Sequence, residues 1–189
     1  MNKGKGIEGL WALGKGAVKD FIEHLGVTWD IIWDDFASLR ENGQEKISEL
    51  LDEWAANIRI RELFEGFLKQ ADRGREAATA YLKNKNLELK DYLEKQVRLT
   101  PHLVGGVDGF MQVYLATPAK RWTRSPRYRQ GVKTGRVVGI VCAVTIFLPV
   151  TLGRAVIGLL PGASRIARYV LKRWERAKNT INTSKKGEE

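Results

Sequence analysis

The feature that most constrains this chain is a long apolar stretch in its last third. Residues 135–162 read GRVVGIVCAVTIFLPVTLGRAVIGLLPG, and residues 137–153 are 17 consecutive uncharged positions. As a helix these 17 residues extend about 25 Å, which is close to the shortest length that crosses a bilayer core. Continued to residue 160 the stretch has 24 residues, of which only Arg154 is charged. The sequence therefore predicts a membrane-inserting segment.

The residues expected to enter the membrane are the large apolar side chains of this stretch. They are Val137, Val138, Ile140, Val141, Val144, Ile146, Phe147, Leu148, Val150, Leu152, Val156, Ile157, Leu159 and Leu160. One continuous helix over residues 137–160 would span the bilayer, with Arg154 reaching toward the headgroups. Alternatively, the chain turns near Pro149 and forms a re-entrant hairpin whose arms are too short to cross. A third interpretation makes the stretch the buried core of a soluble helical bundle.

Charge is divided unevenly between the two halves of the chain. Residues 1–100 carry 16 Lys and Arg against 18 Asp and Glu, whereas residues 101–189 carry 16 against 4. Seven of these cations precede the apolar stretch in residues 118–136, and six follow it in residues 165–178. Cations on both sides favour contact with anionic lipid but do not orient the segment, because the positive-inside preference needs an asymmetry.

Specific residues follow from this pattern. The cations expected to contact anionic lipid or nucleic acid are Lys120, Arg121, Arg124, Arg127, Arg129, Lys133, Arg136, Arg165, Arg168, Lys172, Arg173 and Arg176. The aromatic residues among them, typical of a membrane interface, are Trp122, Tyr128, Tyr169 and Trp174. Small residues recur at four-residue steps at Gly135, Gly139 and Ala143, a ridge that predicts close helix packing and, in a bilayer, self-association.

The first hundred residues predict a bundle of amphipathic helices. Apolar residues recur at three- and four-residue steps over residues 7–39, 47–58 and 60–71, and a further helix is expected within residues 75–99. The glycines of residues 105–109 predict a loop. The expected fold is mainly α, with a helical region (1–100), a loop and basic linker (101–136), an apolar membrane-inserting segment (137–163), a basic amphipathic helix (164–178) and a disordered tail (179–189).

The sequence gives little support for catalysis or for metal and cofactor binding. His24 and His102 are the two histidines, and neither has a cysteine or a regularly spaced carboxylate nearby. Asp34 and Asp35 are adjacent, point to different sides of a helix and are expected to be solvated. Cys142 lies within the apolar stretch and is expected to act as a small hydrophobic residue. We therefore expect no catalytic, metal or cofactor residues.

These features favour a non-enzymatic membrane-associated helical protein with a structural, scaffolding or assembly role. The expected partners are anionic lipids, a second copy bound through the apolar segment, and a protein bound to the N-terminal helices on the cytoplasmic or virion-interior side. The helical layout with an apolar hairpin near its C-terminal end resembles channel-forming colicin domains, which implies membrane permeabilisation as an alternative; insertion during genome delivery would have the same features. Nucleic-acid binding through the basic half is a further alternative.

Overall fold

The computed structural model describes residues 28–96, 98–115 and 125–186. Within these ranges the chain is helical and contains no strand, which confirms the mainly α prediction. The described helices are α2 (Trp29–Ser38), α3 (Gly43–Ala56), α4 (Ile58–Ala71), α5 (Arg75–Lys95), α6 (Pro101–Leu115), α7 (Pro126–Phe147), α8 (Val150–Gly158) and α9 (Ala163–Lys186).

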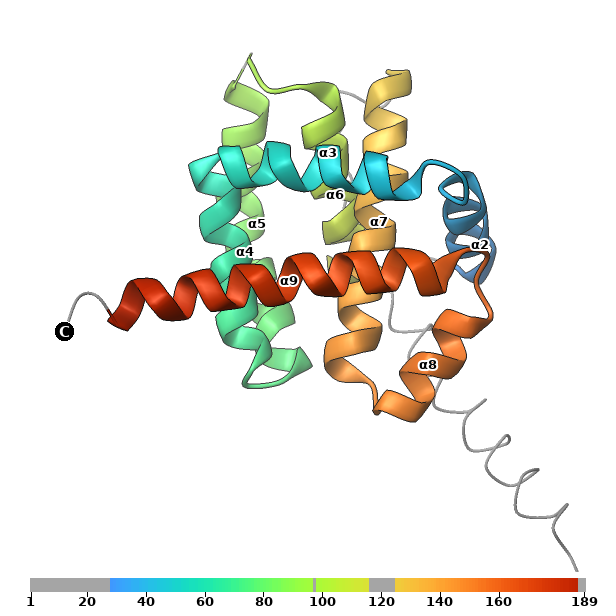
Figure 1. Cartoon of the computed structure of the whole chain (residues 1–189). Helices are drawn as coiled ribbons and strands as arrows, with labels where there is room; N and C mark the ends of the chain where they lie inside the picture. Colours follow the sequence, from blue (N-terminus) through green and yellow to red (C-terminus); the bar gives the residue numbers. More distant parts are fainter. Residues whose placement is uncertain (1–27, 97, 116–124, 187–189) are drawn as a thin grey trace, which may run out of the picture.

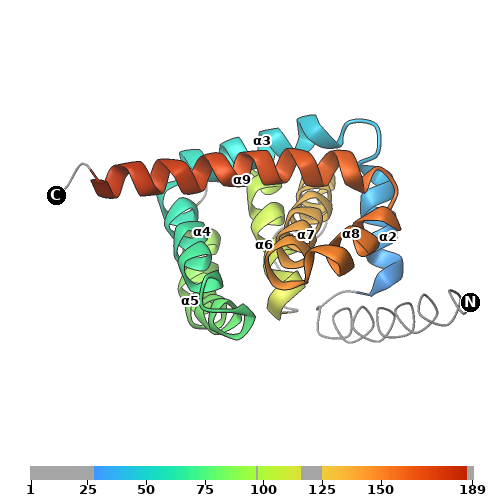
Figure 2. The same ribbon diagram turned by 60° about the horizontal axis from the view of Figure 1, so that its bottom comes forward.

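Helices α6 and α7 form the centre of the molecule, and their contact is the most extensive between any two helices (Figure 1). Helices α3 and α9 lie against each other and cross one face of this pair, as Figure 2 shows. Helices α4 and α5 pack together beside α6, whereas α2 and α8 contact α7. Helices from both halves of the sequence therefore share one hydrophobic core.

A group of stacked and edge-to-face aromatic rings joins α3, α4 and α6 within that core. The rings of Trp54 and Phe64 stack with their centroids 4.4 Å apart. The ring of Phe110 meets Phe64 edge-on at 4.7 Å and Phe67 at 5.3 Å. Such pairs add about 0.5–1.5 kcal/mol beyond the area that they bury. This group fixes α6 against the N-terminal helices.

The helices predicted between residues 47 and 99 are confirmed, including the break between the second and third apolar stripes. Helix α3 ends at Ala56 and α4 begins at Ile58, where the apolar periodicity changes phase. The side chain of Asn57 accepts a hydrogen bond from the backbone N–H of Ile60 at 3.1 Å and so caps α4. Residues 1–27, which hold most of the first predicted stripe, lie outside the described residues.

The loop predicted at residues 105–109 is instead the middle of α6. Glycine inside a helix costs about 1 kcal/mol relative to alanine, so the sequence pattern alone favours a loop. In the structure these glycines let two helices touch. A Cβ atom on Gly105 would overlap the backbone oxygen of Tyr128, and one on Gly109 would overlap that of Val132. Close packing against α7 therefore explains the glycines. The residue numbers of the contacting pairs rise together, from Gly105 with Tyr128 to Gly109 with Val132, so α6 and α7 run parallel.

The basic residues after 125 also belong to a helix. Helix α7 begins at Pro126, a residue whose fixed φ suits the first helical position, and continues through the predicted linker to Phe147. A break at Leu148 and Pro149 separates it from α8, so residues 137–160 do not form one continuous helix. Helix α9 contains the predicted basic helix and extends to Lys186, beyond the point where the sequence predicts a disordered tail.

Candidate functional site

Exposed and half-buried apolar side chains extend from the end of α7 through the turn and along α8, and we call this region the apolar corner. It consists of Ile146, Phe147, Leu148, Pro149, Val150, Leu152, Ile157 and Leu159. Val150 is 68% exposed and Leu159 is 50% exposed, and the other large apolar side chains of the corner are half-buried. The only charged residue between positions 137 and 164 is Arg154, which lies exposed on α8. The corner therefore presents apolar side chains to solvent with one cation beside them.

The rest of the predicted membrane-inserting residues lie in the core. Seven of them are buried: Val137, Val138, Ile140, Val141, Val144, Val156 and Leu160. Among the described residues, α7 is the one helix long and apolar enough to cross a membrane, yet most of its apolar window is buried inside the molecule. The predicted segment is thus divided between a buried part in α7 and an exposed part at the corner.

The predicted lipid-contacting cations after the corner lie on α9. Arg165, Arg168, Lys172 and Arg176 are exposed, whereas Ile166 and other apolar residues of the same helix face the core. Arg168 also donates a hydrogen bond to the backbone oxygen of Ser164 at 3.3 Å. Helix α9 follows α8 after a four-residue turn, so the first turns of α9 adjoin the C-terminal end of α8 (Figure 1).

The cations before the corner occupy the opposite end of α7. Arg127 and Arg129 are exposed in its first turn, and about 30 Å of helix separates Arg127 from Phe147 at the corner. The described cations Arg127 and Arg129 therefore lie far from the turn between α7 and α8. Lys120, Arg121, Trp122 and Arg124 lie outside the described residues.

Three of the predicted lipid-contacting cations pair with acidic residues of the first half of the chain. Arg136 contacts Asp35 through two hydrogen bonds, from Nε to Oδ2 at 2.6 Å and from Nη2 to Oδ1 at 2.9 Å. Lys133 pairs with Asp34 at 3.0 Å, and Arg173 pairs with Asp52. The expectation that Asp35 is solvated is wrong, because its side chain is only 1% exposed. These pairs join α2 and α3 to α7 and α9.

The predicted interface aromatics have different surroundings. Tyr128 is buried and donates a hydrogen bond to Oδ2 of Asp108 at 2.7 Å, so it links α7 to α6. Tyr169 is half-buried on α9. The side chain of Trp174 is not among those that the structure describes.

The glycine ridge on α7 packs within the chain. A Cβ atom on Gly135 would overlap the backbone oxygen of Gly106, and one on Gly139 would lie 2.9 Å from a methyl group of Val113. Ala143, the third residue of the ridge, is buried. These residues therefore pack closely against α6 within one chain, and self-association through the ridge stays a prediction.

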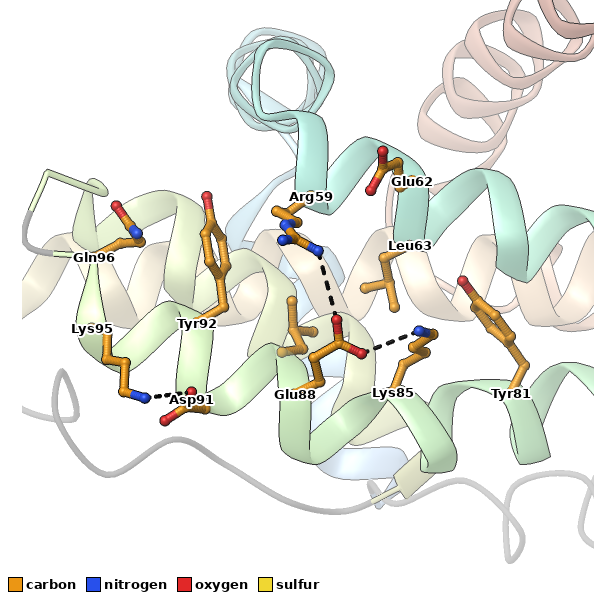
Figure 3. Close-up of a pocket in the computed structure, with 11 residues that line it drawn as sticks. Arg59, Glu62, Leu63, Tyr81, Lys85, Glu88, Asp91, Tyr92, Lys95 and Gln96 are labelled. Atoms are coloured by element: carbon orange, nitrogen blue, oxygen red, sulfur yellow. Dashed lines mark hydrogen bonds and ion pairs between the residues drawn. The ribbon is translucent and has the colours of Figure 1, made fainter.

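A groove between α4 and α5 contains mainly charged side chains that neutralise one another (Figure 3). Glu88 pairs with Arg59 at 3.7 Å and with Lys85 at 3.1 Å, and Lys95 pairs with Asp91 at 2.8 Å. Five of the charged side chains that line this groove therefore pair with one another.

The structure also assembles a group of side chains that the sequence analysis did not find. One carboxylate oxygen each from Glu49 and Glu53 of α3 and one ring nitrogen of His102 of α6 lie within 4.8 Å of one another. Forty-nine residues separate His102 from Glu53, so no local spacing reveals their contact. The two Glu lie one helical turn apart, which is the only sequence signal that could have indicated the group.

Comparisons with protein-family models, with curated proteins and with solved structures give no match for this chain.

Proposed function

We propose that the protein binds anionic membranes through the apolar corner, with the bundle intact, and serves there as a non-enzymatic structural or assembly component. The observation that carries this proposal is the exposure of Val150, which follows half-buried Phe147 and Leu148 in the chain, and of Leu159 at the other end of α8, in a segment whose only charge is Arg154. Burying one such side chain fully in an apolar phase is favourable by about 1.5–3 kcal/mol. Contiguous exposed apolar side chains commonly mark a binding surface.

The charges around the corner support an anionic surface as the partner. Arg154 lies on α8, and Arg165 and Arg168 lie on the first turns of α9, exposed and without an acidic partner that the structure records. Each cation close to an anionic leaflet contributes about 1 kcal/mol of attraction. Hydrophobic insertion of the corner and electrostatic attraction at its edge would therefore act together.

Flotation of the purified protein with liposomes tests this proposal. We expect binding to liposomes that contain phosphatidylserine, weaker binding to neutral liposomes, and partial release in high salt because salt screens the charges. A monodisperse protein that does not float with either lipid would contradict membrane binding. RNA and DNA would then be the polyanions to test, since exposed Arg127 and Arg129 also suit phosphate contacts.

A second candidate function is membrane permeabilisation after opening of the bundle. The observation behind it is that α7 is long and apolar enough to cross a bilayer, and its burial in the bundle means that the bundle must open before it can insert. Released from α6, α7 would expose the ridge of Gly135 and Gly139 to a second copy, which is the type of interface that associates helices in bilayers. Release of a dye from the same liposomes would distinguish permeabilisation from attachment.

A further inference from the structure

We propose that Glu49, Glu53 and His102 form a binding site for Zn²⁺ or a similar divalent transition metal ion, independent of membrane binding. The three residues come from two helices, α3 and α6, that cross in the core. An imidazole nitrogen with two carboxylate oxygens is a donor set that suits zinc, whereas Mg²⁺ and Ca²⁺ prefer oxygen alone. The ion would connect α3 to the first turn of α6.

The distances suit the proposed ion. Nδ1 of His102 lies 3.3 Å from Oε2 of Glu53. Ligands of a tetrahedral zinc ion with bonds of about 2.0–2.2 Å lie about 3.3–3.5 Å from one another. The carboxylate of Glu49, within 4.8 Å of the other two groups, is exposed and can rotate toward them. The remaining coordination position would hold water.

The surroundings hold two of the ligands in place. The hydroxyl of Thr100 donates a hydrogen bond to Oε2 of Glu53 at 3.1 Å and accepts one from the backbone N–H of Leu103 at 3.1 Å. Thr100 therefore caps α6 and orients Glu53 with one side chain. Groups that orient metal ligands in this way commonly change metal affinity by about 10–100-fold when they are removed.

Among the described residues, the two carboxylates of this group have no basic side chain beside them other than the imidazole. In the part of the chain that the structure describes, no Lys or Arg pairs with Glu49 or Glu53. The side chain of His102 is only 8% exposed and directed at Glu53, and its Nε2 has no hydrogen-bond partner. The two carboxylates repel each other, and a divalent ion between them would remove that repulsion; on binding the ion, Nδ1 would exchange its contact with Oε2 of Glu53 for a bond to the metal.

Calorimetric titration of the EDTA-treated full chain with Zn²⁺ at pH 7.5 tests the site. We expect the unaltered protein to bind one ion per chain. Glu49→Gln and Glu53→Gln should each bind it at least about tenfold more weakly. Glu45→Gln, which removes an exposed carboxylate one turn earlier on α3, is the matched control and should bind as the unaltered protein does. His24→Ala should also leave binding unchanged, and Mg²⁺ should not compete.

Several results would overturn the site. They are the absence of saturable Zn²⁺ binding, equal effects of Glu45→Gln and Glu53→Gln, loss of binding in His24→Ala, or equal competition by Mg²⁺. Glu49 is exposed, so Glu49→Gln is expected to fold and keeps the test valid if Glu53→Gln does not. As a second readout, thermal unfolding should shift upward with Zn²⁺ in the unaltered protein and not in Glu49→Gln.

Discussion

The glycines between α6 and α7 show how single residues determine the central contact of the molecule. Gly105 and Gly109 on α6 and Gly131 and Gly135 on α7 each leave no room for a Cβ atom, because a backbone atom of the facing helix occupies its place. Each of them costs helix propensity but allows two backbones to approach. The central pair of helices therefore depends on the absence of side chains as much as on buried apolar ones.

We predict opposite effects for alanine at two helical glycines. Gly135→Ala should destabilise the fold by about 1–3 kcal/mol, because its methyl group would overlap the backbone of Gly106. Gly158→Ala on α8, where a Cβ would meet nothing within 4 Å, should stabilise it by about 0.5–1 kcal/mol. Urea unfolding followed by circular dichroism measures both. Equal effects of the two substitutions would contradict the close approach of α6 and α7.

Asp35 is the second residue with unusual surroundings, since it is a buried carboxylate paired with Arg136. Burial raises the pKa of Asp35 above its ordinary value of 3.8, and hydrogen bonding and attraction from Arg136 offset only part of that rise. The folded state therefore binds this proton more tightly than the unfolded chain does. The stabilising contribution of Asp35 is complete below pH 3.8 and is lost as the pH rises through its folded pKa.

The corresponding prediction concerns the difference in unfolding free energy between the unaltered protein and Asp35→Asn. That difference should become less favourable to the unaltered protein as the pH rises from 3.8 through the folded pKa, because asparagine does not titrate. Denaturant unfolding of both proteins at several pH values measures it. The opposite slope would mean that Arg136 lowers the pKa more than burial raises it. Protonation of Asp35 in acid is accordingly not expected to destabilise the bundle.

At the scale of helices, the sequence predicted α3, α4, α5 and α9 because each has an apolar stripe or a basic amphipathic pattern of helical period. It did not predict α6, whose glycines are typical of a loop until a facing backbone is known. The prediction of one continuous helix over residues 137–160 is wrong, because the helix is interrupted at Leu148 and Pro149. The alternative prediction has a turn near Pro149, which is where the interruption lies. The corner could not be predicted from the sequence. Its residues belong to the same apolar stretch as the buried residues of α7, and only the packing of the folded chain determines which of them are exposed.

Two clusters of cations, one on α9 and the other on the first turn of α7, provide a test at the same scale. If the corner docks with the bundle intact, replacing Arg165, Arg168 and Lys172 with glutamine should weaken binding to anionic liposomes by at least about tenfold. Replacing Arg127 and Arg129 should have a much smaller effect, since about 30 Å of helix separates them from the corner. Flotation at fixed salt measures both, and equal losses would contradict docking through the corner.

The bundle encloses α7, the one described helix that is long and apolar enough to cross a membrane, and ion pairs join its acidic first half to its basic second half. Asp34, Asp35 and Asp52 pair with Lys133, Arg136 and Arg173. The charge asymmetry seen in the sequence is thus partly satisfied inside the chain, which the sequence could not reveal because the partners are about a hundred residues apart. The unpaired cations that remain at the surface are those available to an external anion.

Hydrogen exchange of α6 distinguishes docking from opening. Residues 102–111 of α6 are all buried in the bundle, and α7 covers their glycine face. Docking with the bundle intact should leave the exchange of α6 amides unchanged when anionic liposomes are added, whereas release of α7 would accelerate it. Mass spectrometry of peptides from residues 101–115 with and without liposomes measures the difference. Accelerated exchange would contradict intact docking and favour the permeabilising candidate.

The most direct test of the account compares charge at the corner with the same charge elsewhere. Val150→Asp combined with Leu159→Asp should reduce flotation with phosphatidylserine liposomes by at least about tenfold, because the variant removes two inserting side chains and adds charge that a bilayer excludes. Leu87→Asp on α5, at a side chain 79% exposed and away from the corner, is the matched control and should float normally. If the corner variant folds and floats like the control, membrane docking through the corner is contradicted.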